Sequence, residues 1–578
     1  MTDIKDTIGE IIIFLFPFIK TSVFMEKKMS DTGNSFILKG KSISPGLAEG
    51  LTFLHRDILR SLDAPTEIDK KDVEEEFGYL EDATTKITGD LIALSARVEN
   101  EMDSRLAAIF DAHQLMLNDL TLREDLRHEI RVNLVSASSA VKSVFLRWEK
   151  RFLLMESQIS RQKGEDIRDI SNRLSNALSG ITGHPLEHIP KDSVLVTKRL
   201  LPSDTIFLSR NSTVAVLLEY GGYGSHTALF VREMGIPCIA DITKILTRIP
   251  AKTHVLVDAN KGEIIIAPDE PQKTIFRQTV DNRSKAFIAA HERAQAQAIT
   301  KDGVLISVLA NVGSPEDTKR AIENGADGVG LFRIEKLYMG RTTPPNEQEL
   351  IDEIRQTLEP SKGKPVCVRL LDIGADKPLP FIGFLAETNP ALGRRGIRLL
   401  HEFPNLMETQ LHAFLKLSGE FDLSILVPMV TLPEDIAKVK ECLLKIASKL
   451  QITALPRLGS MIETPAAALS ANKIKPYVDF LSFGTNDLTQ YSFAADRENA
   501  AVEQYFNDSS DVIFRLLKMT LADVADLPLS ICGELAGREE YVEKLLQCGI
   551  KSFSVAPPLI PIIKETIRDS WCNANLKV

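Results

Sequence analysis

The stretch VDFLSFGTNDLTQYSFAADR, residues 478–497, indicates the fold of the larger part of this chain. Its apolar run, Val478–Phe483, is typical of a buried strand, and Gly484 ends that run just ahead of Asn486 and Asp487. Polar groups placed directly after a buried parallel strand are where α/β enzymes keep their chemistry. A carboxylate and an amide side by side suit Mg²⁺ bound together with a phosphorylated substrate. One such strand end is usually only a capped turn, so the interpretation depends on recurrence of the pattern.

The same alternation of strand and helix recurs throughout residues 303–578. Helical patterns such as Glu316–Asn324, Glu347–Leu358, Ala391–Leu417 and Glu434–Leu450 separate the apolar runs. The eight candidate strands are Val304–Val312, Gly328–Phe332, Val366–Leu371, Leu423–Met429, Arg457–Ile462, Val478–Phe483, Leu527–Ile531 and Ser552–Val555. Eight βα units in about 275 residues predict a (β/α)₈ barrel.

A barrel places its functional groups just after each strand. The residues found there are Asn311, Arg333 with Glu335, Arg369 with Asp372, Glu463, Asn486 with Asp487, and Cys532 with Glu534, and Arg497 follows the sixth strand. Three arginines suit phosphate and carboxylate oxygens, and Glu463 and Asp487 could share a Mg²⁺. A lone arginine is at least as often part of a structural ion pair, but convergence at one rim favours a site for an anion and a metal.

Cys532, in the segment SICGELAG, lies where a proton donor or a nucleophile could reach that site. An ordinary thiol has a pKa of about 8.5 and is mostly protonated near neutrality, so it can act as an acid. A small buried filler is the commoner role of cysteine. The sequence context leaves these two roles evenly balanced.

The composition is that of a globular, multidomain protein. The chain has 578 residues, of which 44% are hydrophobic and 26% charged, so two to four domains are expected. The net charge of −10 and the lack of a long basic run argue against nucleic acid as a partner. The six cysteines include no close pair, which favours a reducing cytoplasm over a disulfide framework or a zinc site.

The amino terminus carries a short apolar segment, Ile11–Phe18, that is too short to span a bilayer. The residues before it include Asp3, Asp6 and Glu10 rather than a basic patch, which argues against a signal peptide and a membrane location. Met25 and Met29 lie just ahead of a strand predicted near Phe36, so we interpret residues 1–24 as an upstream start that is not translated.

The sequence pattern ahead of the barrel changes from strand-like to helical and back to strand-like. We predict an extension at 1–34, a small α/β domain formed by 35–62 and 181–268, a helical block inserted at 63–180, a linker helix at 269–300 and the barrel at 301–578. Amphipathic spacing with almost no glycine or proline supports the helical block.

The small α/β domain contains GGYGSHT at 221–227, ahead of a helix-like segment. Ser225 suits a helix N-cap, which would place His226 in the first helical turn. A phosphoryl group on that imidazole would meet free N–H groups and the positive end of the helix dipole. Most histidines have no special role, but for His226 we favour a functional one.

These motifs together resemble enzyme I of the bacterial phosphotransferase system, the phosphoenolpyruvate–protein phosphotransferases, from about residue 36 to the carboxyl terminus. The most specific matches are GSHT around His226, DGVGLFRIEKLYM at 327–339, ETPAAA at 463–468, FGTNDLTQY at 483–491 and CGELAG at 532–537. Shorter matches are DIGADK at 372–377 and NPALGRRGIR at 389–398.

The resemblance implies a Mg²⁺-dependent phosphotransferase with a phosphohistidine intermediate on a swivelling α/β domain. It assigns attack on phosphorus to His226, protonation of the departing enolate to Cys532, substrate binding to Arg333, Arg369, Asn486 and Arg497, and the metal to Glu463 and Asp487. It further implies release of pyruvate, transfer to the phosphocarrier protein HPr docked on the helical block, a homodimer formed through the barrel, and a cytoplasmic location.

Several positions depart from the family pattern. Glu316 falls where the family usually has an arginine that contacts the substrate phosphate, and Tyr223 and Gly224 stand where Arg-Thr is usual. Arg394 occupies a usual tryptophan position, and we hypothesise that it restores lost positive charge at the site. Whether Glu316 and Tyr223 reduce or abolish activity stays open.

Two alternatives are weighed against this function. A pyruvate phosphate dikinase or phosphoenolpyruvate synthase shares the histidine domain and the barrel, but the helical region has no phosphate-cradling glycine loop for ATP. A degenerate enzyme I acting as a regulatory scaffold is supported by Glu316 and Tyr223. It is opposed by the presence of His226, Cys532 and both metal carboxylates.

Overall fold

The computed structural model describes residues 35–573, with gaps at 56–64, 102–103, 155–157, 181–185, 188, 206, 209–211, 222–225, 340, 375–378, 380, 383–386, 388, 498, 500–501 and 525. The predicted extension at 1–34 and most of the GGYGS loop therefore lie outside the described residues. The chain divides into two compact units, Met1–Arg277 and Gln278–Val578, and each is described by itself.

The first unit contains an eight-stranded mixed sheet in the order β1-β8-β7-β3-β4-β5-β6-β2. Neighbours from β3 to β6 are parallel, so the carboxyl ends of these four strands lie at one edge. The strands are β1 (Phe36–Lys39), β2 (Lys41–Ser44), β3 (Leu47–His55), β4 (Ser193–Thr197), β5 (Thr213–Leu218), β6 (Cys238–Ala240), β7 (His254–Asp258) and β8 (Glu263–Ile266). Short helices α7 (Pro202–Thr205), α8 (His226–Glu233) and α9 (Ile245–Arg248) accompany them.

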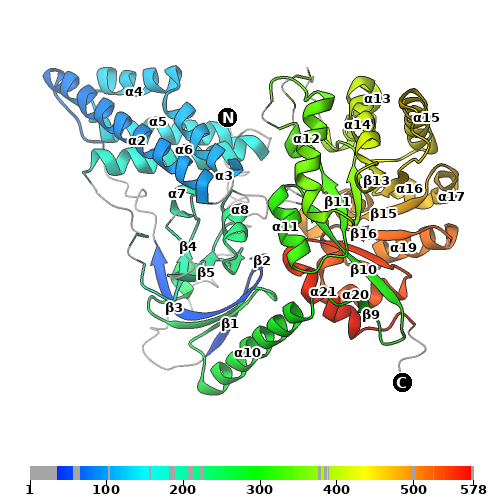
Figure 1. The fold of residues 1–578 in the computed structure, drawn as a ribbon. Helices are drawn as coiled ribbons and strands as arrows, with labels where there is room; N and C mark the ends of the chain where they lie inside the picture. Colours follow the sequence, from blue (N-terminus) through cyan, green and yellow to red (C-terminus); the bar gives the residue numbers. More distant parts are fainter. Residues whose placement is uncertain are drawn as a thin grey trace, which may run out of the picture. The chain divides into compact units, whose positions relative to one another are not determined.

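Five long helices follow β3 in the chain and precede β4. They are α2 (Val73–Glu101), α3 (Ser104–Leu117), α4 (Leu120–Asn133), α5 (Ala137–Leu154) and α6 (Gln158–Leu178), and they pack as a bundle (Figure 1). Leu91, Phe110, Ile130 and Leu174 are fully buried inside it. The helical signal and its position between two strands of the small sheet agree with the sequence prediction.

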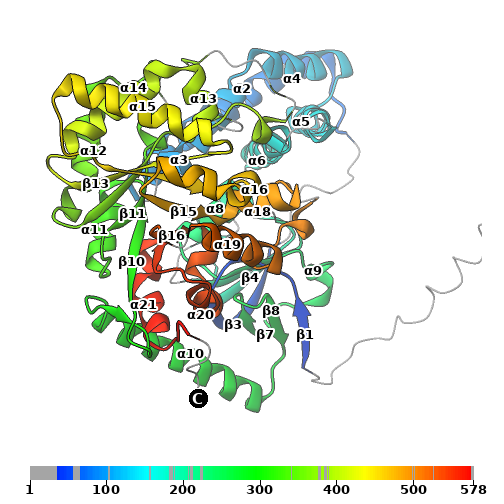
Figure 2. The same ribbon diagram turned by 90° about the vertical axis from the view of Figure 1, so that its right-hand side faces the viewer.

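The second unit is a closed barrel of eight parallel strands, as predicted. Strand β10 pairs with both β17 and β11, which closes the sheet (Figure 2). The strands are β10 (Leu305–Val312), β11 (Val329–Arg333), β12 (Pro365–Arg369), β13 (Asp422–Val427), β14 (Arg457–Ile462), β15 (Phe480–Gly484), β16 (Leu529–Cys532) and β17 (Ser552–Val555), with β9 (Ala298–Ile299) added antiparallel at one end. Each lies within about two residues of its predicted bounds.

Helices surround this barrel on the outside (Figure 2). They are α11 (Pro315–Glu323), α12 (Glu347–Leu358), α13 (Ile397–Glu402), α14 (Pro404–Leu417), α15 (Pro433–Leu450), α16 (Pro465–Leu469), α17 (Ala471–Ile474), α18 (Thr485–Phe493), α19 (Asp511–Asp523), α20 (Glu539–Gln547) and α21 (Ile560–Arg568). The barrel carries the largest buried apolar core of the described residues.

The predicted helix Ala391–Leu417 is wrong as a single element. A 3₁₀ turn at Pro390–Leu392 is followed by α13 and then α14. Gly396 has φ of +55°, a left-handed conformation that interrupts a helix, and Pro404 starts α14 at its first position, where no N–H is needed. The interruption contains Arg395, whose side chain contacts Asp372 and Asp487.

The linker prediction corresponds to α10 (Glu270–Glu292), which crosses the division at Arg277. Asp269 and Gln272 cap its start reciprocally, each backbone N–H donating to the other's side chain at 3.0 and 2.8 Å. In the part of the chain that the structure describes, no helix has the length and apolar character needed to cross a bilayer. All six cysteines lie in that part and all are free thiols.

Candidate active site

The carboxyl end of the barrel gathers most of the side chains that the sequence singles out. Parallel strands end on the same side, so residues far apart in the chain meet there. Arg333 and Arg369 end β11 and β12 in register, and Gly484 ends β15 beside Cys532 at the end of β16. The predicted site residues in this unit are Arg333, Arg369, Glu463, Asn486, Asp487, Arg497 and Cys532.

A chain of alternating acids and arginines crosses this end of the barrel. Arg369 donates to Glu335 at 2.9 Å and its other terminal nitrogen lies 3.1 Å from Asp372. Arg395 joins Asp372 at 2.9 Å to Asp487 at 2.8 Å. Burial would lower the pKa of Arg369, but Glu335 and Asp372 outweigh it and raise that pKa above its ordinary value. These ion pairs fix the positions of the Arg369 and Arg395 guanidinium groups.

Arg395 is a residue that the sequence interpretation missed. It follows the 3₁₀ turn rather than a strand, so a search limited to strand ends passes over it. The adjacent Arg394, hypothesised to restore charge at the site, instead pairs with Glu387 at 2.8 Å and Glu402 at 3.1 Å. The hypothesis for Arg394 is therefore wrong in its geometry, and its neighbour supplies the cation.

This difference predicts opposite results for two adjacent substitutions. With the phosphotransfer that the resemblance implies as the assay, Arg395→Ala should lower the rate of transfer from phosphoenolpyruvate by about 10²-fold, because it removes the cation that contacts both Asp372 and Asp487. Arg394→Ala should leave KM for phosphoenolpyruvate within about twofold of wild type, since it removes only solvent-accessible ion pairs. Steady-state kinetics on both variants tests this, and a sharp rise in KM for Arg394→Ala alone would restore the earlier hypothesis.

Arg333 differs from the other arginines because its guanidinium has no hydrogen-bond or ion-pair partner among the described residues. Crowding by protein atoms and the nearby Arg369 lower its pKa. The side chain is nevertheless exposed at the barrel mouth, so water offsets most of that lowering and Arg333 stays cationic. An unpaired cation beside a pre-arranged one is suited to an incoming anion.

Glu463 follows β14 directly and is 1% exposed. Its carboxylate accepts from the N–H of Met429, whose left-handed φ of +56° turns that N–H toward it. Burial, with Asp487 and Asp372 nearby, raises its pKa to about 8. A Cβ on Gly484 would lie 2.7 Å from a Glu463 oxygen, so glycine is required on the adjacent strand.

Glu463 and Asp487 fit a hard divalent cation such as Mg²⁺. Burial is the main cause of the raised pKa of Glu463, and repulsion from Asp487 and Asp372 adds to it, so a cation beside these carboxylates would favour the ionised form of Glu463. No group of three or more His, Cys, Asp or Glu side chains among the described residues could hold a metal alone. The two carboxylates would therefore act with substrate oxygens and water completing the coordination, which is a common arrangement for Mg²⁺.

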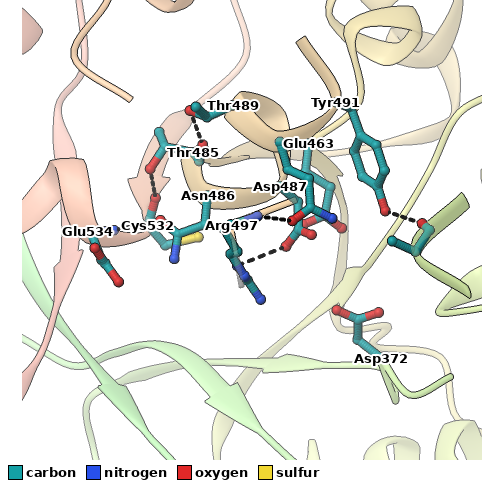
Figure 3. A network of polar contacts seen from close by, with 12 residues as sticks. Asp372, Glu463, Thr485, Asn486, Asp487, Thr489, Tyr491, Arg497, Cys532 and Glu534 are labelled. Atoms are coloured by element: carbon teal, nitrogen blue, oxygen red, sulfur yellow. Dashed lines mark hydrogen bonds and ion pairs between the residues drawn. The ribbon is translucent and has the colours of Figure 1, made fainter. Parts of the chain in front are cut away.

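Cys532 and Asn486 lie at the opposite side of the same network (Figure 3). The Cys532 thiol donates to the Phe483 carbonyl at 3.3 Å, and burial raises its pKa to about 11. Asn486 accepts from the N–H of Glu534 at 3.0 Å, so its oxygen faces that N–H and its amide nitrogen faces away. The site thus holds a protonated thiol and an amide donor.

Arg497 approaches Asp487 from beyond α18, at 3.7 Å between guanidinium and carboxylate (Figure 3). Its longer contact and greater exposure leave it more adjustable than Arg395. The mouth of the barrel therefore combines fixed and adjustable cations.

His226 is the first residue of α8 in the other unit, as the sequence predicts. Nothing is described of its side chain, and Tyr223, Gly224 and Ser225 lie outside the described residues. The buried Thr227 hydroxyl donates to the Leu200 carbonyl at 2.5 Å and holds the start of α8 against the loop between β4 and α7. This hydrogen bond of Thr227 fixes the backbone at the start of α8, where His226 lies.

Glu316 stands in the first turn of α11 and is exposed. An acidic side chain is favourable there because it faces the positive end of the helix dipole. The residue supplies a negative rather than a positive charge at this position.

Three protein-family models match segments of this chain, and together they include residues of both compact units. Residues 289–572 match the family described as PEP-utilising enzyme, PEP-binding domain. Residues 39–163 match PEP-utilising enzyme, N-terminal, and residues 189–262 match PEP-utilising enzyme, mobile domain.

Relatives from several organisms align with most of the chain. The Phosphoenolpyruvate-protein phosphotransferase of Priestia megaterium is 33% identical, covering 86% of this chain and 88% of the relative. That of Haloferax volcanii is 34% identical over 85% and 86%, and that of Listeria monocytogenes is 33% identical over 90% and 91%. A solution structure titled Enzyme I (nEIt) covers 43% of the chain at 26% identity, with a TM-score of 0.37 that is too low to carry an argument.

Proposed function

The chain belongs to the phosphoenolpyruvate–protein phosphotransferase family of PEP-utilising enzymes, and we propose that it phosphorylates its own His226 from phosphoenolpyruvate. The phosphoryl group then passes to the phosphocarrier protein HPr as the first step of a sugar phosphotransferase system. The observation that carries the proposal is the barrel mouth, where Arg333, which has no ion-pair partner among the described residues, lies beside the fixed Arg369, and Arg395 is fixed by Asp372 and Asp487. That combination suits a substrate with both a phosphate and a carboxylate.

Binding would depend on the cations and the amide. Arg333, Arg369 and Arg497 hold the phosphate and carboxylate oxygens, and the amide nitrogen of Asn486 donates to the substrate. Glu463 and Asp487 would hold Mg²⁺, which supplies neutralisation of charge on the phosphoryl oxygens. Arg395 keeps Asp487 and Asp372 in place and acts as a positioning residue.

The transfer step balances with groups from this chain. A ring nitrogen of His226 attacks phosphorus, and the bond between phosphorus and the enol oxygen breaks. The Cys532 thiol gives its proton to the methylene carbon of the enolate, which becomes pyruvate, and the thiolate is reprotonated from water. The arginines stabilise charge on the phosphoryl oxygens while the bond breaks.

The parts of the chain take corresponding roles in this proposal. Residues 35–62 and 181–268 form the phosphohistidine domain, 63–180 the helical subdomain on which HPr docks, 269–300 the linker and 301–578 the substrate-binding barrel. His226 must reach the barrel mouth and then HPr, which requires the phosphohistidine domain to swivel. We further propose a homodimer through the barrel and a cytoplasmic location, which six free thiols favour.

Phosphoryl transfer from radiolabelled phosphoenolpyruvate with Mg²⁺ tests the proposal. Wild type should acquire an acid-labile label, because a phosphoramidate is hydrolysed in acid, and His226→Ala should acquire none. His412→Ala is the matched control, since this histidine lies on α14 of the barrel, and it should label like wild type. Added HPr should remove the label from wild type.

The opposite outcome favours the second candidate, a non-catalytic regulatory scaffold. The specific observation behind it is the exposed carboxylate of Glu316 at a position where the family usually has an arginine. A well-folded wild type that takes no label, but that labels after Glu316→Arg, would assign the loss of activity to that residue.

A further inference from the structure

A cavity in the first unit is lined by none of the proposed site residues. It has a volume of about 480 Å³, within the range of small-molecule sites. His55, Lys198 with Arg199, and Tyr220 reach it from the carboxyl ends of β3, β4 and β5, and α6 and α9 complete the wall. Open α/β sheets bind ligands at the carboxyl ends of their parallel strands.

The lining of this cavity is rich in cations. Arg168, Lys198 and Arg199 line it against a single carboxylate, that of Asp204. Asp204 already accepts from the Leu201 N–H at 2.8 Å. The Lys198 ammonium makes no hydrogen bond or ion pair within the described residues and is exposed. The excess positive charge favours an anionic ligand.

The three cations of the lining differ in how they are held. The Arg199 guanidinium lies 5.1 Å from the centre of the Tyr220 ring, which orients its plane. Arg168 is ion-paired with Glu149, so its charge is largely balanced. Lys198 follows β4 and has no ion-pair partner within the described residues, so an anion would depend chiefly on Lys198, with the oriented Arg199 directly after it in the chain.

Asn172 adds a requirement for a hydrogen-bond donor. It lines the cavity from α6, and its side-chain oxygen is buried with no hydrogen-bond partner among the residues that the structure describes. A buried acceptor without a donor is unfavourable, so a ligand hydroxyl at this point would be favoured. An anion alone would leave this oxygen unsatisfied.

We propose that the cavity binds a small organic phosphate that also carries hydroxyl groups, with its phosphate on Lys198 and Arg199 and a hydroxyl donating to Asn172. None of the residues that line the cavity has a role in the proposed phosphotransfer, and the binding proposal does not depend on that function. Tyr220 lines the cavity and lies in the segment that leads to His226. A bound ligand would therefore contact the start of the loop that carries the histidine.

Isothermal titration calorimetry on the full chain tests this. The His226→Ala protein is used without phosphoenolpyruvate, so that no phosphohistidine competes for the cations. Glucose 6-phosphate is the probe, and inorganic phosphate and glucose are its matched parts. Saturable binding is expected for glucose 6-phosphate, at least tenfold weaker binding for inorganic phosphate, and none for glucose. Raised salt should weaken the binding.

Substitutions assign the binding to this cavity. The double change Lys198→Ala with Arg199→Ala should weaken glucose 6-phosphate binding at least tenfold, and Asn172→Ala should weaken it without affecting inorganic phosphate. Lys191→Ala is the charge-matched control, because this exposed lysine precedes β4 at its opposite end, and it should bind normally. Thermal unfolding checks that each variant is folded.

Three outcomes would overturn the proposal. They are undiminished binding in the folded double variant, no saturable binding of glucose 6-phosphate at millimolar concentration, and binding that phosphoenolpyruvate abolishes. The last would place the probe at the barrel arginines. Loss of phosphotransfer activity would bear only on the proposed function, because binding is measured on a protein that cannot form phosphohistidine.

Discussion

Replacing Asp487 with asparagine is expected to lower the rate of phosphoryl transfer from phosphoenolpyruvate by about 10²- to 10³-fold. Asp487 is 7% exposed, and its carboxylate contacts Arg395 at 2.8 Å and Arg497 at 3.7 Å. Asparagine keeps the size of the side chain but removes its charge. The variant would leave Arg395 with one carboxylate and would leave Glu463 as the only charged protein ligand proposed for Mg²⁺.

The dependence on metal separates this effect from simple damage to the fold. His226 labelling should be measured from micromolar to tens of millimolar Mg²⁺, and Asp487→Asn should require a higher concentration for half-maximal rate. Asp511→Asn is the control, because Asp511 also lies in the first turn of a barrel helix but is fully solvent-exposed. Wild-type Mg²⁺ dependence in a folded Asp487→Asn protein would show that Asp487 does not hold the metal.

The barrel could be predicted from the sequence because its signals are local. Each strand is an apolar run of the right length, and the run at Arg457–Ile462 has the observed bounds. Once strand order is known, parallel pairing alone brings strand ends together, and this explains why Arg333, Arg369 and Cys532 converge. The kind of ligand that these strand ends would bind could then be predicted from the residue types alone.

The features of the site that the sequence did not predict depend on contacts between segments, and no local pattern encodes those contacts. Arg394 and Arg395 are adjacent and chemically identical, so only the turn at Gly396 decides which one faces Asp372. The unpaired state of Arg333 likewise follows from Glu335 being taken up by Arg369. Such choices are set by three-dimensional packing and by competition among neighbouring charges.

Replacing Cys532 with alanine is expected to lower transfer from phosphoenolpyruvate by about 10²- to 10⁴-fold, the usual contribution of a positioned general acid. The thiol is 3% exposed and is held by the Phe483 carbonyl at 3.3 Å. Burial raises its pKa to about 11, so the acid form persists well above the pH at which an ordinary thiol ionises. The step that depends on Cys532 should therefore stay constant from pH 7 to pH 10.

The reverse reaction gives Cys532 a distinct signature. Removing a proton from the methyl group of pyruvate requires the thiolate, which is the minor form below the raised pKa. Exchange of pyruvate protons for deuterium, followed by NMR, should therefore rise about tenfold per pH unit between pH 7 and pH 9. Cys442→Ala, on the outer helix α15, should exchange like wild type, whereas Cys532→Ala should lose the enzyme-catalysed exchange. Equal exchange in wild type and Cys532→Ala would show that a group other than Cys532 moves the proton. That group would not be a second thiol at a strand end, because Cys532 is the only cysteine that ends a strand in the described barrel.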